Sequence, residues 1–262
     1  MAMQTIRLER QGWVLVATID RPGSPMNAVD GQLHDDLEEL FGLLRKEAEA
    51  RVVVLTGGDK RAFSAGGDFD WFPELRRFER LDPLRRSAKQ MIWDLLDVEI
   101  PIVAALNGAA AGLGASIALL CDLVVMSERA VIVDPHIDVG LVGGDGGTVA
   151  WPALLGPLAA KRHLLLGEPL TAAEALRLGV AAEVCPSEAV HERAMAWAER
   201  LAARAPLAVR GTKIAVNAQL KRALLESFDL ATALEVPCFL SRDHAEAVTA
   251  LAERRPPAFE GR

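Results

Sequence analysis

The stretch IPIVAALNGAAAGLGASIALLCDLVV, residues 100–125, decides the fold of this chain. It opens with β-branched and small apolar residues, turns at Asn107–Gly108, and continues through glycines into an apolar run of helical length. We predict a buried strand, a turn and a buried helix, because polar and small residues interrupt the apolar run too early for a membrane span. The first N–H groups of such a helix lack intrahelical acceptors, so they offer a place for a negatively charged oxygen.

On either side of this stretch, short β-branched segments alternate with segments of helical periodicity. Strands are predicted at 5–20 (a hairpin around Gly12), 51–58, 122–127 and 130–134. A helix is predicted over residues 31–50, with Asp30 as its N-cap. From about residue 157 onward the pattern is helical, with Thr171 and Ser187 as N-caps. The alternation indicates an α/β fold with a largely parallel sheet, followed by a helical C-terminal part.

The bulk composition restricts the classes of partner. The 262 residues include 29 Lys and Arg against 36 Asp and Glu, which gives a net charge of −7. Nucleic acid is not expected as the main partner, because phosphate binding requires a basic surface. The three cysteines are too scattered for a disulfide framework, and the N-terminal residues lack the apolar segment of a signal peptide. We expect a soluble, cytoplasmic protein without a membrane partner.

A second glycine-rich stretch, RAFSAGGDFDWF at residues 61–72, follows the strand predicted at 51–58. Small residues allow a ligand to approach the backbone, and free N–H groups there could hold an oxygen anion. After the loop, Asp68 or Asp70 is predicted to cap a helix. A plain tight connection is the alternative to an anion site.

Two known motifs are incomplete in these stretches. The dinucleotide fingerprint has Gly112 and Gly114 but Ile117 in place of its third glycine, so nicotinamide binding is not favoured. Ser64 and Ser116 each lie one glycine short of the nucleophile elbow, which leaves a serine hydrolase as a weak alternative. The Ser116 hydroxyl is expected to bond to a carbonyl one turn earlier in its helix.

The stretch DPHIDVGLVGGDGGT, residues 134–148, concentrates acidic and basic groups among glycines. In an extended chain, Asp134, His136 and Asp138 would point to one face. We do not expect a metal site, because three such ligands on one strand rarely converge on one ion and the proline between them disturbs the register. Asp145 is either a helix N-terminal residue favoured by the helix dipole or a functional carboxylate, depending on where its loop points.

Together these stretches resemble the crotonase superfamily, the enoyl-CoA hydratase/isomerase family. The matching segments follow the family's order over nearly the whole chain: RPGSPMNAV, AFSAGGDF, IPIVAALNGAAAGLGASIALLCDLVV, DVGLVGGDGGT, LLLGEPLTAAEALRLGVAAEV and AERRPPAFEGR. The resemblance implies an α/β fold with a ββα-spiral core over residues 1–200 and a helical trimerisation region over residues 201–262. It also implies an acyl-CoA thioester as substrate, coenzyme A being part of the substrate and no other cofactor being needed, and a homotrimer or dimer of trimers.

The resemblance also assigns residues to a site by position. In this family two backbone N–H groups hold the thioester oxygen as it becomes an enolate, and here these belong to Gly67 and Leu113. Only donors aimed at the developing charge lower the barrier, and a small-residue loop and a helix start suit that role. Further substrate contacts are expected from Met26, Ala65, Asp68, Phe69 and Ser116. Phe69, Trp71 and Phe72 either wall the acyl pocket or belong to the core.

The chain departs from the hydratases of the family at both of their catalytic glutamates. Where the hydratases place the first, in the helix, this chain has Ser116, and where the second follows a proline it has His136. A serine hydroxyl does not ionise near neutral pH, so it is a poor replacement for a group that returns a proton to the substrate. Hydration is therefore not the favoured reaction.

Asp145 matches the position at which dienoyl-CoA isomerases and aromatic-acyl dehalogenases of the superfamily carry a catalytic aspartate. We predict that Asp145 is the main acid/base, with a pKa raised by an apolar pocket, and that His136 assists it. Relocation of a proton, as in isomerisation, is then the favoured reaction. Two alternatives stay open. One is a β-diketone-type C–C hydrolase, a class of the superfamily that needs no CoA and has a His/Asp pair similar to His136 and Asp145. The other is a non-catalytic acyl-CoA-binding protein.

Overall fold

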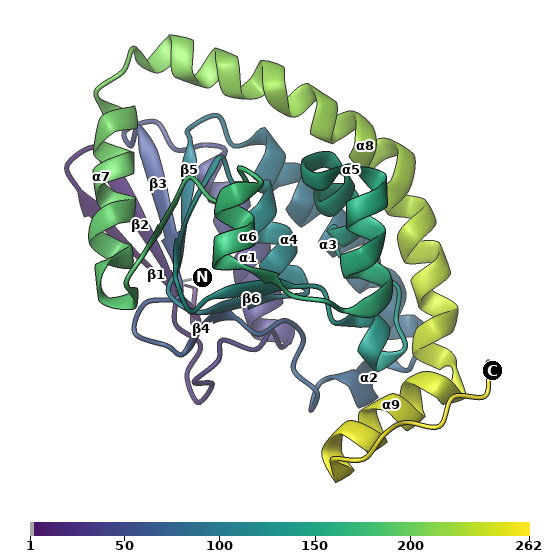
Figure 1. The fold of residues 1–262 in the computed structure, drawn as a ribbon. Helices are drawn as coiled ribbons and strands as arrows, with labels where there is room; N and C mark the ends of the chain where they lie inside the picture. The colour runs from purple at the N-terminus through teal and green to yellow at the C-terminus, as the bar shows by residue number, and fades with distance from the viewer. Residues whose placement is uncertain (1–2) are drawn as a thin grey trace.

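Two sheets organise the computed structural model, which describes residues 3–262 (Figure 1). The larger sheet has the order β1-β2-β3-β5-β7-β10 and the smaller one the order β4-β6-β8-β9. β1 and β2 form the predicted antiparallel hairpin, and the other neighbours in the larger sheet are parallel. The strands are β1 (Ile6–Gln11), β2 (Val14–Ile19), β3 (Val52–Thr56), β4 (Ala62–Ser64), β5 (Ile102–Leu106), β6 (Ala109–Ala111), β7 (Leu123–Ser127), β8 (Val131–Val133), β9 (Leu170–Thr171) and β10 (Glu183–Cys185).

A unit of two strands and a helical segment recurs along the chain. In the pairs β3–β4, β5–β6 and β7–β8, the first strand lies in the larger sheet and the second in the smaller, and helices follow each pair. The α-helices are α1 (Gly31–Leu44), α2 (Phe72–Leu75), α3 (Phe78–Asp97), α4 (Leu113–Leu120), α5 (Gly147–Leu166, interrupted at Gly156), α6 (Ala172–Arg177), α7 (Val190–Ala202), α8 (Pro206–Leu240) and α9 (Arg242–Glu253). The α/β class and the ββα spiral predicted from the sequence are confirmed.

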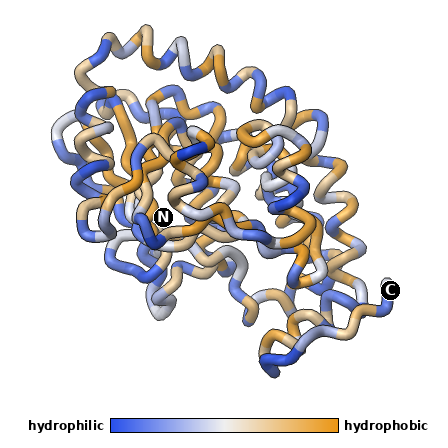
Figure 2. Tube along the Cα trace, viewed as in Figure 1, coloured by the Kyte–Doolittle hydropathy of each residue, from blue (hydrophilic) through white to orange (hydrophobic). Residues whose placement is uncertain are grey.

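Both faces of the larger sheet are covered, which explains its continuous apolar strands. Val53, Leu55 and Ile102 face the main core between the sheets and the helices, and Val52 and Val54 face α7 on the outside. Strands buried on both faces read as unbroken runs of β-branched residues. Figure 2 shows this concentration of hydrophobic residues along the strands, and Figure 1 shows α7 lying against the sheet.

The C-terminal helices lie across the core. α8 packs on α3 and α5 and runs over the top and one side of the molecule before α9 (Figure 1). The predicted boundary between residues 200 and 201 falls just before the end of α7 at Ala202, and the division into two parts stays a prediction. No helix within residues 3–262 combines the length and apolar character that a membrane crossing needs.

The predicted helix caps have mixed outcomes. Asp30 and Thr171 cap α1 and α6 as predicted, each accepting a backbone N–H three residues further on, at 2.9 and 3.3 Å. The Ser187 prediction is wrong, because its hydroxyl bonds to that of Ser127 at 2.6 Å and α7 begins at Val190 without a side-chain cap. A short strand, β6, also lies between the predicted turn and α4, where the sequence indicated only a turn.

Candidate active site

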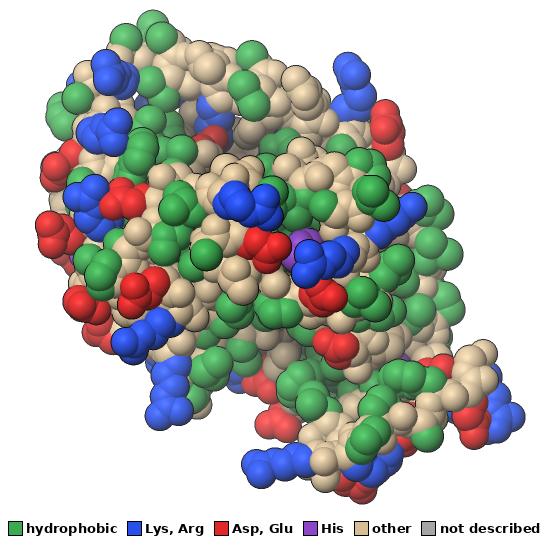
Figure 3. Space-filling view, viewed as in Figure 1, with side chains coloured by type: hydrophobic (Ala, Val, Ile, Leu, Met, Phe, Trp, Pro, Cys, Tyr) green, Lys and Arg blue, Asp and Glu red, His purple; other side chains and the backbone are tan. Residues whose placement is uncertain are grey.

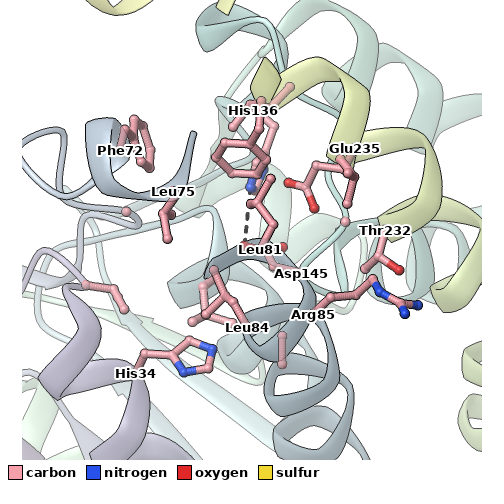
Figure 4. A pocket seen from close by; sticks show the side chains of 18 of the residues that line it. His34, Phe72, Leu75, Leu81, Leu84, Arg85, His136, Asp145, Thr232 and Glu235 are labelled. Carbon is pink, nitrogen blue, oxygen red and sulfur yellow. Dashed lines mark ion pairs between the residues drawn. The ribbon is translucent and has the colours of Figure 1, made fainter. Parts of the chain in front are cut away.

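A mostly apolar pocket lies between α1, α2, α3 and α8 and ends at the loop before α5 (Figure 4). It encloses about 770 Å³, including its open mouth. Most of its wall consists of leucine, aromatic and small side chains. The titratable residues that line it are His34, Arg85, His136, Asp145 and Glu235. Such a pocket with a few convergent polar groups is the usual form of a small-molecule site.

The two predicted backbone donors, Gly67 and Leu113, both line this pocket. Val29 donates to the Gly66 carbonyl at 2.7 Å and accepts from the Asp68 amide at 2.8 Å, which turns the Gly67 N–H away from Val29. Leu113 is the first residue of α4, so its N–H has no intrahelical acceptor. Among the residues that the structure describes, neither N–H donates to a protein group. Both are therefore available to a ligand.

Close backbone packing brings the two donor loops together. Gly66 has a φ of +78°, and a Cβ on it would come within 2.9 Å of the Ala111 carbonyl oxygen. Gly112 has a φ of +51°, and its own Cβ would lie 3.7 Å from the Gly66 Cα and 3.4 Å from the His136 Cε1. Only glycine suits both the positive φ and the close approach at Gly66. The Leu113 amide thus enters the pocket beside the Gly67 loop and next to His136.

An ion-pair cluster fixes the loop that carries Gly67. Arg21 pairs with Asp30 at 2.8 Å and with Asp68, whose other oxygen accepts the Asp70 amide at 3.1 Å. The prediction that Asp68 or Asp70 caps a helix is wrong, since α2 begins at Phe72 without a side-chain cap. Asp68 instead ties the loop to the segment before α1.

The structure brings together the acidic and basic groups of residues 134–148, though not in an extended strand. The chain enters a 3₁₀ helix over His136–Val139. The His136 Nδ1 lies 2.5 Å from Asp134 Oδ1, and its Nε2 lies 3.4 Å from Asp145 Oδ2. Asp138 lies away from them, against the C-terminal end of α5. The imidazole is therefore held between two carboxylates. The second of these is Asp145, whereas the alternating pattern had grouped His136 with Asp134 and Asp138.

Charged neighbours outweigh burial in this pair. Burial opposes a charge on His136, but Asp145 and Asp134 together raise the pKa of His136 well above its ordinary value. Burial also favours the neutral form of Asp145, yet the His136 charge and hydrogen bonds from His136, Ser116 and the Gly147 amide hold the pKa of Asp145 below its ordinary value. The predicted rise in the Asp145 pKa is therefore wrong, because the imidazolium beside the carboxylate outweighs the apolar walls.

Neither of the two candidate serine nucleophiles is hydrogen-bonded to a histidine among the described residues. The buried Ser116 hydroxyl donates to Asp145 Oδ1 at 3.0 Å instead of to a helix carbonyl, contrary to the expectation for a helical serine. The Ser64 hydroxyl donates to the Asn27 carbonyl at 2.8 Å. Within residues 3–262 no imidazole bonds to either hydroxyl. Activation of a serine nucleophile is typically the work of a hydrogen-bonded histidine, so this alternative gains no support.

Glu235 on α8 is a pocket carboxyl group that the sequence analysis did not single out (Figure 4). Burial raises the pKa of Glu235 to about 8; Asp145 and Asp134 add to the rise and His136 opposes it. Glu235 is therefore mostly protonated near neutral pH. Its one sequence signal is that it is the sole charged residue in the apolar stretch 230–240.

The other predicted substrate contacts lie outside the residues that line the pocket. Trp71 and Phe72 do line it, and Phe69, which is 47% exposed, meets Phe72 edge-on with 5.4 Å between ring centroids. The Met26 carbonyl accepts the Ala65 amide at 3.0 Å, which joins two loops near the site. Contacts with substrate stay predictions for Met26, Ala65, Asp68, Phe69 and Ser116.

Asp134, His136 and Asp145 are also the one group among the described residues whose possible metal-ligand atoms approach within 4.8 Å of each other. His136, however, turns each ring nitrogen toward a different carboxylate. A bound ion needs the ligand atoms of all three residues to converge on one point. We therefore interpret the trio as a hydrogen-bonded relay, in which Asp134 orients the ring that neighbours Asp145.

Comparison with known proteins places this geometry in context. A family model described as enoyl-CoA hydratase/isomerase matches residues 9–262. The (E)-benzylidenesuccinyl-CoA hydratase of Thauera aromatica is 34% identical over 260 residues, which cover 98% of this chain and 99% of that protein.

Solved structures are similar over comparable lengths. An enoyl-CoA hydratase/isomerase from Mycobacterium paratuberculosis has a TM-score of 0.89 and 36% identity, covering 95% of this chain and 98% of its own. A β-diketone hydrolase from the cyanobacterium Anabaena sp. PCC 7120, bound to (S)-3-oxocyclohexyl acetic acid, has a TM-score of 0.84 and 31% identity, covering 90% of this chain and 94% of its own. The similarity therefore extends over nearly the whole molecule.

Proposed function

The chain belongs to the enoyl-CoA hydratase/isomerase family, and we propose that it moves a proton between two carbons of an acyl-CoA thioester. The thioester brings its own coenzyme A, so the proposal includes no further cofactor. Hydration is less favoured, because Ser116 and His136 stand where the family resemblance expects the two hydratase glutamates.

One observation carries this proposal: the pocket holds two carboxyl groups in different surroundings, Asp145 beside His136 at 3.4 Å and Glu235 without an ion-pair partner among the described residues. Near neutral pH Asp145 is ionised beside the His136 imidazolium, whereas burial keeps Glu235 mostly protonated. Two titratable groups whose pKa values are pushed apart by their surroundings identify the base and the acid of a site. The free N–H groups of Gly67 and Leu113 line the same pocket and suit an enolate oxygen, each contributing about 3 kcal/mol of stabilisation.

The proposed reaction removes one proton and returns one. The Asp145 carboxylate takes a proton from an acidic carbon of the acyl chain, and the electron pair left behind moves through the conjugated system to the thioester oxygen. The N–H groups of Gly67 and Leu113 bind that oxygen. Glu235 then gives its proton to a second carbon as the electrons return, so a double bond forms at a new position. Transfer of the first proton from Asp145 to Glu235 restores both groups.

Deuterium exchange tests the proposal directly. In deuterated water, the protein is expected to introduce deuterium into the acyl chain of saturated and unsaturated acyl-CoAs, measured by mass spectrometry. Asp145→Asn should slow this exchange by about 10²- to 10⁴-fold, the usual contribution of a positioned acid or base. Asp138→Asn, the same change in the same segment but outside the pocket, should leave the exchange unchanged. Full exchange and turnover by Asp145→Asn would refute the assignment.

A second candidate is hydrolysis of a C–C bond in a β-diketone. The His136 relay and the similarity to the Anabaena β-diketone hydrolase support it. Water, deprotonated by the Asp145–His136 pair, would add to one carbonyl carbon. The bond from that carbon to the central carbon would break, leaving an enolate of the second carbonyl that Glu235 protonates. The products are a carboxylic acid and a ketone.

Binding and turnover separate these possibilities. Calorimetric binding of acyl-CoA together with deuterium exchange supports proton relocation. Cleavage of cyclic 1,3-diketones by a protein that does not bind acyl-CoA supports C–C hydrolysis. Acyl-CoA binding without exchange in any member of a chain-length series would instead indicate a non-catalytic binding protein.

A further inference from the structure

His34 is a buried histidine with one ring nitrogen, Nε2, that makes no hydrogen bond within the described residues. It lies in the first turn of α1, is 4% exposed, and lines the pocket. Its Nε2 is buried without a partner, and its Nδ1 lies 3.9 Å from the exposed Asp35 Oδ1, which is beyond hydrogen-bond reach. Within the described part of the chain, Nε2 is therefore the unsatisfied ring nitrogen.

The other buried histidines are held by the protein. His136 lies between two carboxylates, and His163 and His244 each direct Nδ1 to a backbone carbonyl oxygen at 2.7 Å. The His244 Nε2 is also unpartnered, but this residue does not line the pocket. A buried polar atom without a partner costs about 1–3 kcal/mol, so an unanchored ring at a pocket wall indicates a partner that the ligand supplies.

The charge state of His34 restricts what that partner is. Burial lowers the pKa of His34, against the opposing charges of Asp35 and Asp145, so the ring is neutral near neutral pH. A neutral imidazole does not attract an anion by charge. It accepts a hydrogen bond from a hydroxyl or donates one to a keto oxygen, according to its tautomer.

The position of His34 places that partner away from the reacting carbons. Figure 4 shows His34 across the pocket from His136 and Glu235, with Leu84 between the two sides. The Trp71 ring lies beside it, with 6.2 Å between the ring centroids. The pocket thus has its acid and base on one wall and one unsatisfied neutral donor or acceptor on the opposite wall.

We propose that His34 recognises an oxygen on the acyl group, so that the substrates are hydroxy- or oxo-acyl compounds and not plain hydrocarbon chains. The identity of the head group as a CoA thioester rests on the proposed function, whereas the recognition of the acyl oxygen does not. A ligand without that oxygen leaves the buried nitrogen unpaired. Sites built to bond a substrate oxygen reject the analogue lacking it by up to about 10⁴- to 10⁵-fold.

Calorimetric titration of the whole protein with two matched series tests the proposal. The first series is hexanoyl-CoA with its 5-hydroxy, 5-oxo and 6-hydroxy derivatives. The second, free of CoA, is cyclohexylacetic acid with (S)-3-oxocyclohexyl acetic acid. At least one oxygenated ligand is expected to bind about tenfold or more tightly than its parent. His34→Phe, which keeps an aromatic ring without nitrogen, should reduce this preference to less than about twofold and leave the affinity for the parent within about threefold.

Two further variants separate recognition from folding. His34→Gln retains an amide that can bond to oxygen, so it should keep part of the preference. His244→Phe, a matched change at an equally buried histidine outside the pocket, should keep all of it.

Each outcome has one meaning for the proposal. A protein that shows no preference in either series, or whose preference survives His34→Phe, overturns it. An equal loss of affinity for every ligand in His34→Phe assigns His34 to the fold and also overturns it. If the thioesters do not bind but the cyclic pair keeps a His34-dependent preference, the proposed acyl-CoA function fails and the assignment of His34 stands.

Discussion

At the scale of single residues, neighbours decide which carboxyl group of the pocket is ionised. Asp145 and Glu235 are both removed from water, and burial alone would raise both pKa values. Asp145 lies against the His136 imidazolium and accepts the Ser116 hydroxyl, so it keeps its charge. Glu235 gains too little from His136 to offset burial and the like charges of Asp145 and Asp134, so it takes up a proton. The same apolar walls thus produce a base and an acid.

Glu235→Gln is expected to make the protein more resistant than the wild type to alkaline pH. The pKa of Glu235 rises from its ordinary 4.5 to about 8 in the folded protein. Between these values the folded state binds more protons than the unfolded state, so the free energy of unfolding of the wild type falls as the pH rises. Glutamine does not ionise and removes this slope. Urea unfolding at about pH 5 and about pH 9 measures the decrease in the free energy of unfolding between the two pH values. An equal decrease in the wild type and in Glu235→Gln would contradict the raised pKa.

Asp134→Asn is expected to lower the pKa of His136. Asp134 supplies a charge and a hydrogen bond at Nδ1, while Asp145 remains at Nε2. Loss of one close opposite charge typically changes such a pKa by about 1 to 3 pH units. NMR titration of the imidazole measures the change, and turnover should fall with it because the ring loses its orientation. An unchanged His136 titration would show that Asp134 has no part in the relay.

Backbone groups of the site were predictable from the sequence, but distant side chains were not. The family resemblance assigned Gly67 and Leu113 by position, and a glycine-rich loop and a helix start, which are local features of residues 61–72 and 107–122, agreed with that assignment. Glu235 and His34 reach the pocket only through the packing of α8 and α1, and no local pattern records that packing. The direction of the Asp145 pKa was mispredicted because the positive charge that His136 holds between Asp134 and Asp145 was not anticipated.

At the scale of elements, the glycine-rich segment before α5 is shaped to receive carboxyl groups. Gly143 and Gly147 pack against the Asp134 carboxylate, and Gly144 packs against that of Glu235. Side chains at these positions would displace the acids that the pocket uses. The run of glycines in residues 143–147 therefore reflects close approach of side chains to the backbone more than a need for flexibility.

Gly144→Ala is expected to reduce turnover with little loss of stability. A Cβ there would collide with the end of the Glu235 side chain, which can move without disturbing the backbone. A displacement of about 1 Å of a catalytic group can cost about 100-fold in rate. Steady-state kinetics and thermal unfolding of the variant measure the two effects.

Gly211→Ala on α8 is the matched control. A Cβ there meets nothing within 4 Å, so turnover should be unchanged. Alanine is favoured over glycine inside a helix by about 0.5–1 kcal/mol, so the melting temperature should rise slightly. If Gly144→Ala turns over as fast as Gly211→Ala, Glu235 is not the acid or its position is not critical.

Elements with a β-branched run or a helical period were predictable, whereas elements without such a pattern were not. β3, β5 and β7 each stand out as buried β-branched or apolar runs, and α1 stands out by its period and its Asp30 cap. β6 consists of three alanines, which carry no strand signal, and it forms by pairing with β4 and β8. A 3₁₀ helix lies at His136–Val139, where the sequence analysis considered an extended segment, and the turn of the chain there places His136 between its two carboxylates.

At the scale of the whole molecule, α8 links the pocket to the outer surface. It supplies Thr232, Glu235 and Phe239 to the pocket wall, and it also carries exposed leucines. Figure 3 shows charges of both signs spread over the visible face, without a single-signed patch. The order of segments along the sequence predicted the spiral, but the course of α8 over α3 and α5 depends on contacts between residues far apart in the chain.

The exposed leucines lead us to expect self-association, and the sequence resemblance implies a trimer or a dimer of trimers. On α5 and α8, leucine side chains are 61–86% exposed at Leu158, Leu165, Leu166, Leu207 and Leu230. Large exposed apolar groups in such number typically mark a protein–protein contact. Sedimentation velocity is therefore expected to give a mass that is a multiple of three times 28.2 kDa.

Replacing Leu158 and Leu166 by glutamate should shift the protein toward the monomer, because burying an unpaired carboxylate in an apolar contact costs several kcal/mol. Leu176→Glu changes a leucine that is 48% exposed on α6 and serves as the matched control, for which the mass should stay that of the wild type. Circular dichroism should show that all three proteins are folded. A wild type that sediments at 28.2 kDa would contradict the expected self-association. A double variant that keeps the mass of an oligomeric wild type would show that these leucines face solvent in the assembled protein.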